Sequence, residues 1–119
     1  ANFSVGTVQL LCIARILLSS RNIGTVFLDE CTASVDFETD AKVQQAVRRA
    51  FAGRTVICIA HRIQTIIDYD RIACLEAGRL AECGTPHDLL QNEKGLFCQL
   101  VESTGKSAAA ELRRRAAAG

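Results

Sequence analysis

Two short, largely apolar runs that end in ionisable side chains constrain the fold of this chain more than any other feature. Thr25–Leu28 leads into Asp29 and Glu30, and Thr55–Ala60 leads into His61. Continuous rather than alternating apolarity is typical of strands covered on both faces, as in a parallel sheet. In open α/β sheets, ligands bind at the carboxyl ends of the strands. If the two strands are parallel neighbours, we expect the two acids and the imidazole to converge at one edge.

Helical patterns surround these strands. Apolar residues recur at helical spacing over residues 4–20 and 39–52, with Ser4 in the position of an N-cap. Further along, the sequence predicts a short helix at 63–68, a hairpin from 71–75 and 80–83, a helix from Pro86 to Gln91 and another at 95–103. The alternation of helices and strands indicates an α/β fold. Because the sheet is short of strands, we expect an N-terminal part to be missing.

The last segment, residues 104–119, is rich in Ala and Arg and has little apolar pattern. Such a composition suits a weak helix or a disordered tail. We therefore divide the chain into residues 1–103 and a flexible tail over 104–119.

Composition excludes several classes of protein. The 119 residues carry a net charge of +1, so their electrostatic field is too weak to indicate a nucleic-acid partner. The chain has no Trp and only one Tyr, so an aromatic platform for stacked bases is not expected. Six cysteines lie far apart without a C-x-x-C pair, which favours free thiols over a disulfide framework or a zinc site. No apolar run is long enough to cross a bilayer.

The acids and the histidine suit a magnesium–nucleotide site. One carboxylate can hold Mg²⁺, and the other can orient or deprotonate an attacking water. An imidazole can contact a terminal phosphate. Taken singly, each signal has a simpler explanation, because two acids after a strand often form a solvated turn or a helix cap. A lone histidine at a strand end is often a surface or core residue.

Together these residues match a more specific pattern. Val26–Glu30 resembles the Walker B strand of ATP-binding-cassette (ABC) ATPases, and Ile59–Arg62 resembles their H-loop. The remaining similar motifs are the signature at Phe3–Gly6 with its helix Gln9–Arg15, the D-loop at Ala33–Asp36, and the exporter-type ending at Asp70–Ile72, Gly78–Arg79 and Glu82–Pro86. The resemblance covers residues 2–102. Ser34–Asp40 is most similar to the second cassette of C-subfamily (multidrug-resistance-associated) exporters.

The resemblance implies roles at the chain's own strand ends. Asp29 would bind the Mg²⁺ shell, and Glu30 would be the general base for the hydrolytic water. His61 would contact the γ-phosphate of ATP.

Other residues would act across an interface with a second cassette. Ser4 and Gly6 would bind the partner's ATP, because they open a helix whose free N–H groups and positive dipole end suit a phosphate. Ser34 and Asp36 would cross the interface and couple the two sites. Ordinary helix-start or turn chemistry is the alternative for Ser34 and Asp36, and both roles can coexist.

The phosphate-binding loop of the family is absent from the sequence. No G-x-x-x-x-G-K-[ST] occurs, and Gly105–Ser107 lacks the earlier glycine and the preceding strand. Thr7 stands where the signature usually has Gln, Val8 where Arg is usual, and Val5 where many cassettes have Gly. We expect the ATP site served by this signature to turn over slowly.

The resemblance implies an incomplete P-loop NTPase-like parallel sheet with flanking helices, truncated before the signature so that Walker A is missing. Within the whole protein it would bind and hydrolyse ATP with Mg²⁺ to power transmembrane export at the cytosolic face of a membrane. Its partners would be a second ATPase domain, in a head-to-tail dimer, and transmembrane domains, with no nucleic acid. The alternatives are a soluble ABC-type ATPase of DNA repair or translation, and a non-catalytic interaction fragment.

Overall fold

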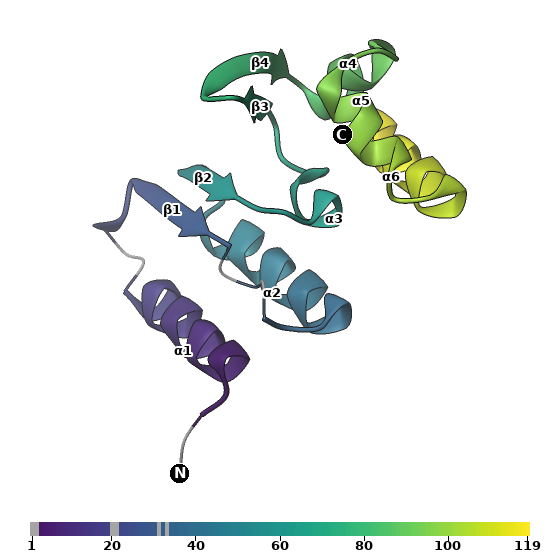
Figure 1. Ribbon diagram of the computed structural model, residues 1–119. Helices are drawn as coiled ribbons and strands as arrows, with labels where there is room; N and C mark the ends of the chain where they lie inside the picture. The colour runs from purple at the N-terminus through teal and green to yellow at the C-terminus, as the bar shows by residue number, and fades with distance from the viewer. Residues whose placement is uncertain (1–2, 20–21, 31, 33) are drawn as a thin grey trace. The chain divides into compact units, whose positions relative to one another are not determined.

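The computed structural model describes residues 3–19, 22–30, 32 and 34–119 (Figure 1). The chain divides into two compact units, residues 1–61 and 62–119, and each is described by itself. Helices and short strands occur in both, so the fold is mixed α/β as predicted. The thiols of Cys12, Cys58, Cys74, Cys83 and Cys98 are free, whereas Cys31 lies outside the described residues.

The first unit is a strand–helix–strand arrangement preceded by a helix. Its elements are α1 (Val5–Leu18), β1 (Thr25–Asp29), α2 (Phe37–Ala50) and β2 (Thr55–Ile59). β1 and β2 pair in parallel from Thr25↔Thr55 to Asp29↔Ile59, which confirms the predicted neighbours. Helix α2 begins at Phe37, two residues earlier than expected, because the Asp36 carboxylate accepts the Thr39 N–H and caps it.

One face of this two-stranded sheet carries the core. Val26 and Leu28 from β1 are buried with Ile13 of α1 and with Val47 and Phe51 of the α2 region. Both helices therefore supply apolar side chains to the same face.

The opposite face corrects the expectation that both faces are covered. Phe27, Ile57 and Ile59 alternate with buried or half-buried residues and are 73, 48 and 57% exposed. Among the described residues of the first unit, α1 and α2 both pack on the other face, so these side chains lie on the uncovered side. The continuous apolarity of each strand is therefore divided between a packed face and an open one.

The second unit begins with a short helix and an antiparallel hairpin. Its elements are α3 (Ile63–Ile66), β3 (Ile72–Glu76), β4 (Arg79–Gly84), α4 (Pro86–Gln91), α5 (Leu96–Glu102) and α6 (Lys106–Ala118). The strands pair from Ile72↔Gly84 to Glu76↔Arg79, as the sequence predicted. The turn residues Ala77 and Gly78 have φ of 49° and 75°, the left-handed geometry that suits the right-handed twist of a tight hairpin.

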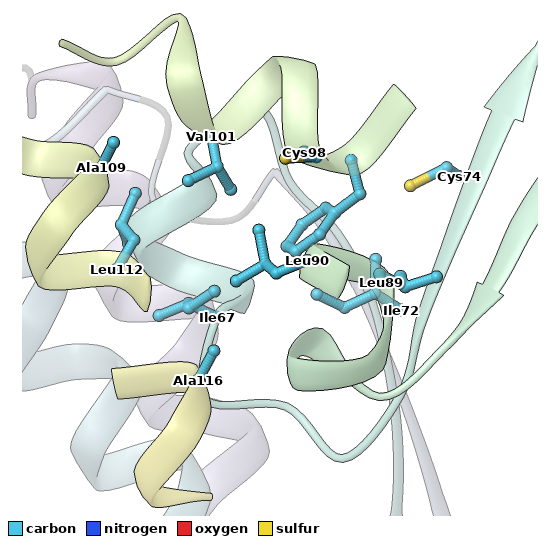
Figure 2. Close-up of a cluster of buried hydrophobic side chains, with 11 residues drawn as sticks. Ile67, Ile72, Cys74, Leu89, Leu90, Cys98, Val101, Ala109, Leu112 and Ala116 are labelled. Carbon is cyan, nitrogen blue, oxygen red and sulfur yellow. The ribbon is translucent and has the colours of Figure 1, made fainter. Parts of the chain in front are cut away.

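Apolar side chains from β3, from the α3 region and from the helices α4, α5 and α6 form the core of this unit (Figure 2). Phe97 and Val101 of α5 are fully buried, and Ile67 after α3 and Leu112 of α6 are 1% exposed. Thr85 caps α4 by accepting the Asp88 N–H, and Pro86 occupies the first helical turn, as expected.

Of the two alternatives for the last segment, a weak helix or a disordered tail, the structure shows a helix, because residues 106–118 form α6. Ala109, Leu112 and Ala116 recur at helical spacing and are buried in the core. Arg113 pairs with Glu102 of α5, and Arg115 pairs with Asp68. The small alanines allow α6 to pack closely, and the arginines find acidic partners on two neighbouring segments.

Candidate functional site

The parallel pairing of β1 and β2 brings two of the predicted site residues together. Asp29 is paired with Ile59 at the carboxyl edge, so the chain emerges from both strands side by side. The Glu30 N–H donates a hydrogen bond to the Ile59 carbonyl at 2.8 Å, extending the ladder by one residue. The Oε1 atom of Glu30 contacts Nε2 of His61. Glu30 and His61 therefore lie at one edge, as the strand ends predicted.

The backbone of Glu30 is strained. Its φ is 48°, in the left-handed region that residues other than glycine rarely occupy. Such a conformation costs on the order of 1–3 kcal/mol and persists where surrounding contacts enforce it, often at functional sites. The bond to Ile59 and the contact with His61 are two such contacts.

The contact between Glu30 and His61 orients the carboxylate more than it stabilises the fold. The His61 side chain is 82% exposed and that of Glu30 is 37% exposed. Ion pairs in this degree of solvent contact contribute little stability, because water screens them. A carboxylate held by an imidazole at an open sheet edge is nevertheless accessible to a substrate and to water.

Asp29 is the exposed last residue of β1 and precedes Glu30 in the chain. Mg²⁺ usually takes one or two protein carboxylates and completes its shell with water and phosphate oxygens. Among the described residues, no group of three or more His, Cys, Asp or Glu is arranged to hold a metal ion. The assignment of Asp29 to the Mg²⁺ shell therefore stays a prediction.

The first turn of α1 holds the predicted Ser4 and Gly6. The Ser4 hydroxyl accepts the Thr7 N–H at 3.1 Å and lies 2.9 Å from the Thr7 hydroxyl, which confirms Ser4 as the N-cap. Gly6 is buried, and a Cβ atom there would lie only 2.9 Å from the Ser34 carbonyl oxygen. Gly6 thus has a packing reason to be glycine within this chain.

Ser34 and Asp36 belong to the loop that follows Glu30. Asp36 begins α2, accepting the Thr39 N–H at 3.0 Å and the Thr39 hydroxyl at 2.6 Å. These hydrogen bonds lower the pKa of the Asp36 carboxyl below its ordinary value, and the bond from the Thr39 hydroxyl has the largest effect. The helix-start alternative for Asp36 is therefore present in the structure. Ala33 of the expected D-loop lies outside the described residues.

Gln9 is a site neighbour that the sequence did not single out. Its Oε1 atom accepts the Ser34 N–H at 3.2 Å, across 25 residues of sequence. Gln9 lies one turn after Gly6 on the same side of α1, and Gly6 also touches Ser34. The three-residue spacing from Gly6 to Gln9 was the sequence signal that could have identified Gln9 as a site neighbour.

The structure keeps the candidates in two groups within the first unit. Glu30 and His61 are in contact, with Asp29 adjacent in the chain. The α1 turn and Ser34 form the second group through Gly6 and Gln9.

Curated proteins similar to this chain include several ABC transporters. "ABC transporter C family member 3" of Dictyostelium discoideum is 50% identical over 117 residues, covering 98% of this chain and 8% of that protein. "ATP-binding cassette sub-family C member 4" of Mus musculus is 48% identical over 116 residues, covering 98% of this chain and 9% of that protein. The chain thus spans less than a tenth of the length of these relatives. No family model matches the sequence.

A solved structure supports the same relationship. "Structure of a bacterial Atm1-family ABC exporter with ATP bound" matches with a TM-score of 0.78 and 36% identity, over 87% of this chain and 18% of the exporter chain. None of the described helices has both the length and the apolar character needed to cross a membrane. The sequence and structural matches agree on ABC transporters, and the chain belongs to that family, with homologues in its C sub-family.

Proposed function

We propose that this chain is part of an ATPase cassette that powers transmembrane export, with Glu30 as its general base. The observation that carries the proposal is the contact between Glu30 and His61 at the carboxyl edge of the parallel β1–β2 pair. Membership in a family of transporters supports the transport role. The neighbour solved with ATP bound supports the choice of nucleotide.

Hydrolysis then follows from the chemistry of these side chains. A Glu30 carboxylate oxygen accepts a proton from water as the water oxygen attacks the γ-phosphorus of ATP. The bond from the γ-phosphorus to the bridging oxygen breaks, giving ADP and phosphate. His61 holds the carboxylate in position, and its imidazole is near enough to the edge to meet the γ-phosphate. Bound Mg²⁺ would neutralise phosphate charge, and Asp29 would supply a ligand to its shell.

The 119 residues do not perform this reaction alone in our proposal. A P-loop NTPase-like sheet would be completed by cassette sequence outside them, which would hold the phosphates. Ser4 and Gly6 would face the ATP of a second cassette in a head-to-tail dimer, with Ser34 and Asp36 at the same interface. Transmembrane domains would anchor the assembly, leaving the cassette at the cytosolic face.

A double-mutant cycle in the complete transporter tests whether His61 acts through Glu30. Residues that act as a unit are strongly non-additive in kcat. We expect Glu30→Gln to lower kcat by about 10²–10⁴-fold, the usual contribution of a general base. Adding His61→Ala should then lower it little further. Glu38→Gln, on the exposed first turn of α2, is the control and should leave kcat unchanged. Fully additive losses would refute the shared role.

A further inference from the structure

The loop between Glu30 and α2 is held at both of its ends by backbone and capping bonds. At its start, the Glu30 N–H donates to the Ile59 carbonyl. At its end, Asp36 accepts the Thr39 N–H. Between them the Val35 N–H donates to the Thr32 carbonyl at 3.2 Å, which forms a local turn.

Among the described residues of this loop, Ser34 is contacted by two residues of α1, Gln9 and Gly6. The Gln9 side-chain oxygen accepts the Ser34 N–H at 3.2 Å. The Gly6 Cα faces the Ser34 carbonyl so closely that an added Cβ would lie 2.9 Å from that oxygen and 3.3 Å from Val35 Cγ1. Neighbouring turns of α1 therefore contact both the N–H and the carbonyl group of Ser34.

We propose that Gln9 is a positioning residue that fixes the loop after Glu30 against the first turns of α1. The inference rests on the proposed function, because its consequence concerns the base Glu30. Ser34 follows Glu30 by only four residues, so a shift of Ser34 alters the chain that carries the carboxylate. Through Gln9, the turn that holds Ser4 and Gly6 is linked mechanically to the base of this chain's own site.

The link gives the Glu30 site a means of regulation. A nucleotide that displaces the first turns of α1 also displaces Ser34, because Gln9 and Gly6 both engage it. Loss of the hydrogen bond between Gln9 and Ser34 should disorder the loop that follows Glu30, without removing any group that binds nucleotide. The effect should therefore appear in kcat and leave the KM for ATP largely unchanged.

Two substitutions separate the hydrogen bond from the shape of the side chain. Gln9→Leu removes the acceptor oxygen at similar size, and Gln9→Glu retains an acceptor for the Ser34 N–H. Gln45→Leu, on the exposed side of α2, controls for adding an apolar side chain to a helix.

The first measurement is amide hydrogen exchange at Ser34 in the 119-residue chain. Gln9→Leu should accelerate exchange about fivefold to tenfold, the range expected for losing one hydrogen bond. Gln9→Glu and Gln45→Leu should leave it within about twofold of the parent. Unchanged exchange in Gln9→Leu would overturn the proposed contact, whatever Glu30 does.

The second measurement is ATP hydrolysis by the complete transporter. Gln9→Leu should lower kcat about tenfold with the KM for ATP within about twofold, and Gln9→Glu should restore most of the loss. Equal losses in both variants would overturn the positioning role. If Glu30→Gln leaves turnover intact, the assignment of Glu30 as the base is wrong. The exchange measurement tests the hydrogen bond between Gln9 and Ser34 independently of that result.

Discussion

Leu112→Ala should destabilise the second unit strongly, because Leu112 is part of its core. The side chain is 1% exposed and extends from α6 into the cluster that includes Leu90 and Val101 (Figure 2). Truncating a buried leucine costs about 2–5 kcal/mol, the sum of lost burial and the cavity left behind. A unit of this size is expected to have roughly 3–9 kcal/mol of total stability. The substitution therefore removes a large fraction of it.

Tyrosine fluorescence during urea unfolding measures this loss selectively. Tyr69 is the only Tyr, the chain has no Trp, and Tyr69 lies in the second unit. With an m-value of about 1 kcal/mol/M, a loss of about 3 kcal/mol lowers the midpoint by about 3 M. Leu100→Ala is the control, since Leu100 on α5 is 42% exposed. A midpoint change no larger in Leu112→Ala than in Leu100→Ala would refute the packing of α6.

Three further expectations follow from the sequence and structure. Calorimetry should detect no tight Mg²⁺-ATP binding by the 119-residue chain, because the sequence lacks a phosphate-binding loop. Ala77→Asn should stabilise the hairpin unit by about 1 kcal/mol in urea unfolding, because φ of 49° suits Asn better than Ala. Because hydrogen bonds lower the folded pKa of Asp36, its cap is complete above the ordinary carboxyl pKa and weakens as pH falls through the lower folded value. Helicity measured against pH should show this loss, and Asp36→Asn should remove it.

Local patterns predicted most of the elements because local chemistry sets their ends. Ser4 and Asp36 cap their helices through bonds within one turn, and Pro86 starts α4 at the predicted residue. The pairing of β1 with β2 was predictable because a helix of the right length separates two apolar runs.

The features that the sequence did not predict depend on contacts between distant segments. The contact of Gln9 with Ser34 spans 25 residues. Helix α6 is held by the buried Leu112 and by Arg115, which reaches back to Asp68. An alanine-rich composition alone predicts neither the burial of Leu112 nor the pairing of Arg115 with Asp68. The sequence therefore indicated a weak helix or a disordered tail.

Single-turnover hydrolysis by the Glu30→Gln transporter tests the central claim most directly. The amide keeps the shape of the carboxylate but cannot accept the proton of the attacking water. The variant should bind ATP with nearly unchanged affinity and retain it uncleaved at the site that contains Glu30. Cleavage of the bound ATP at the parent rate would contradict the assignment of Glu30 as the general base.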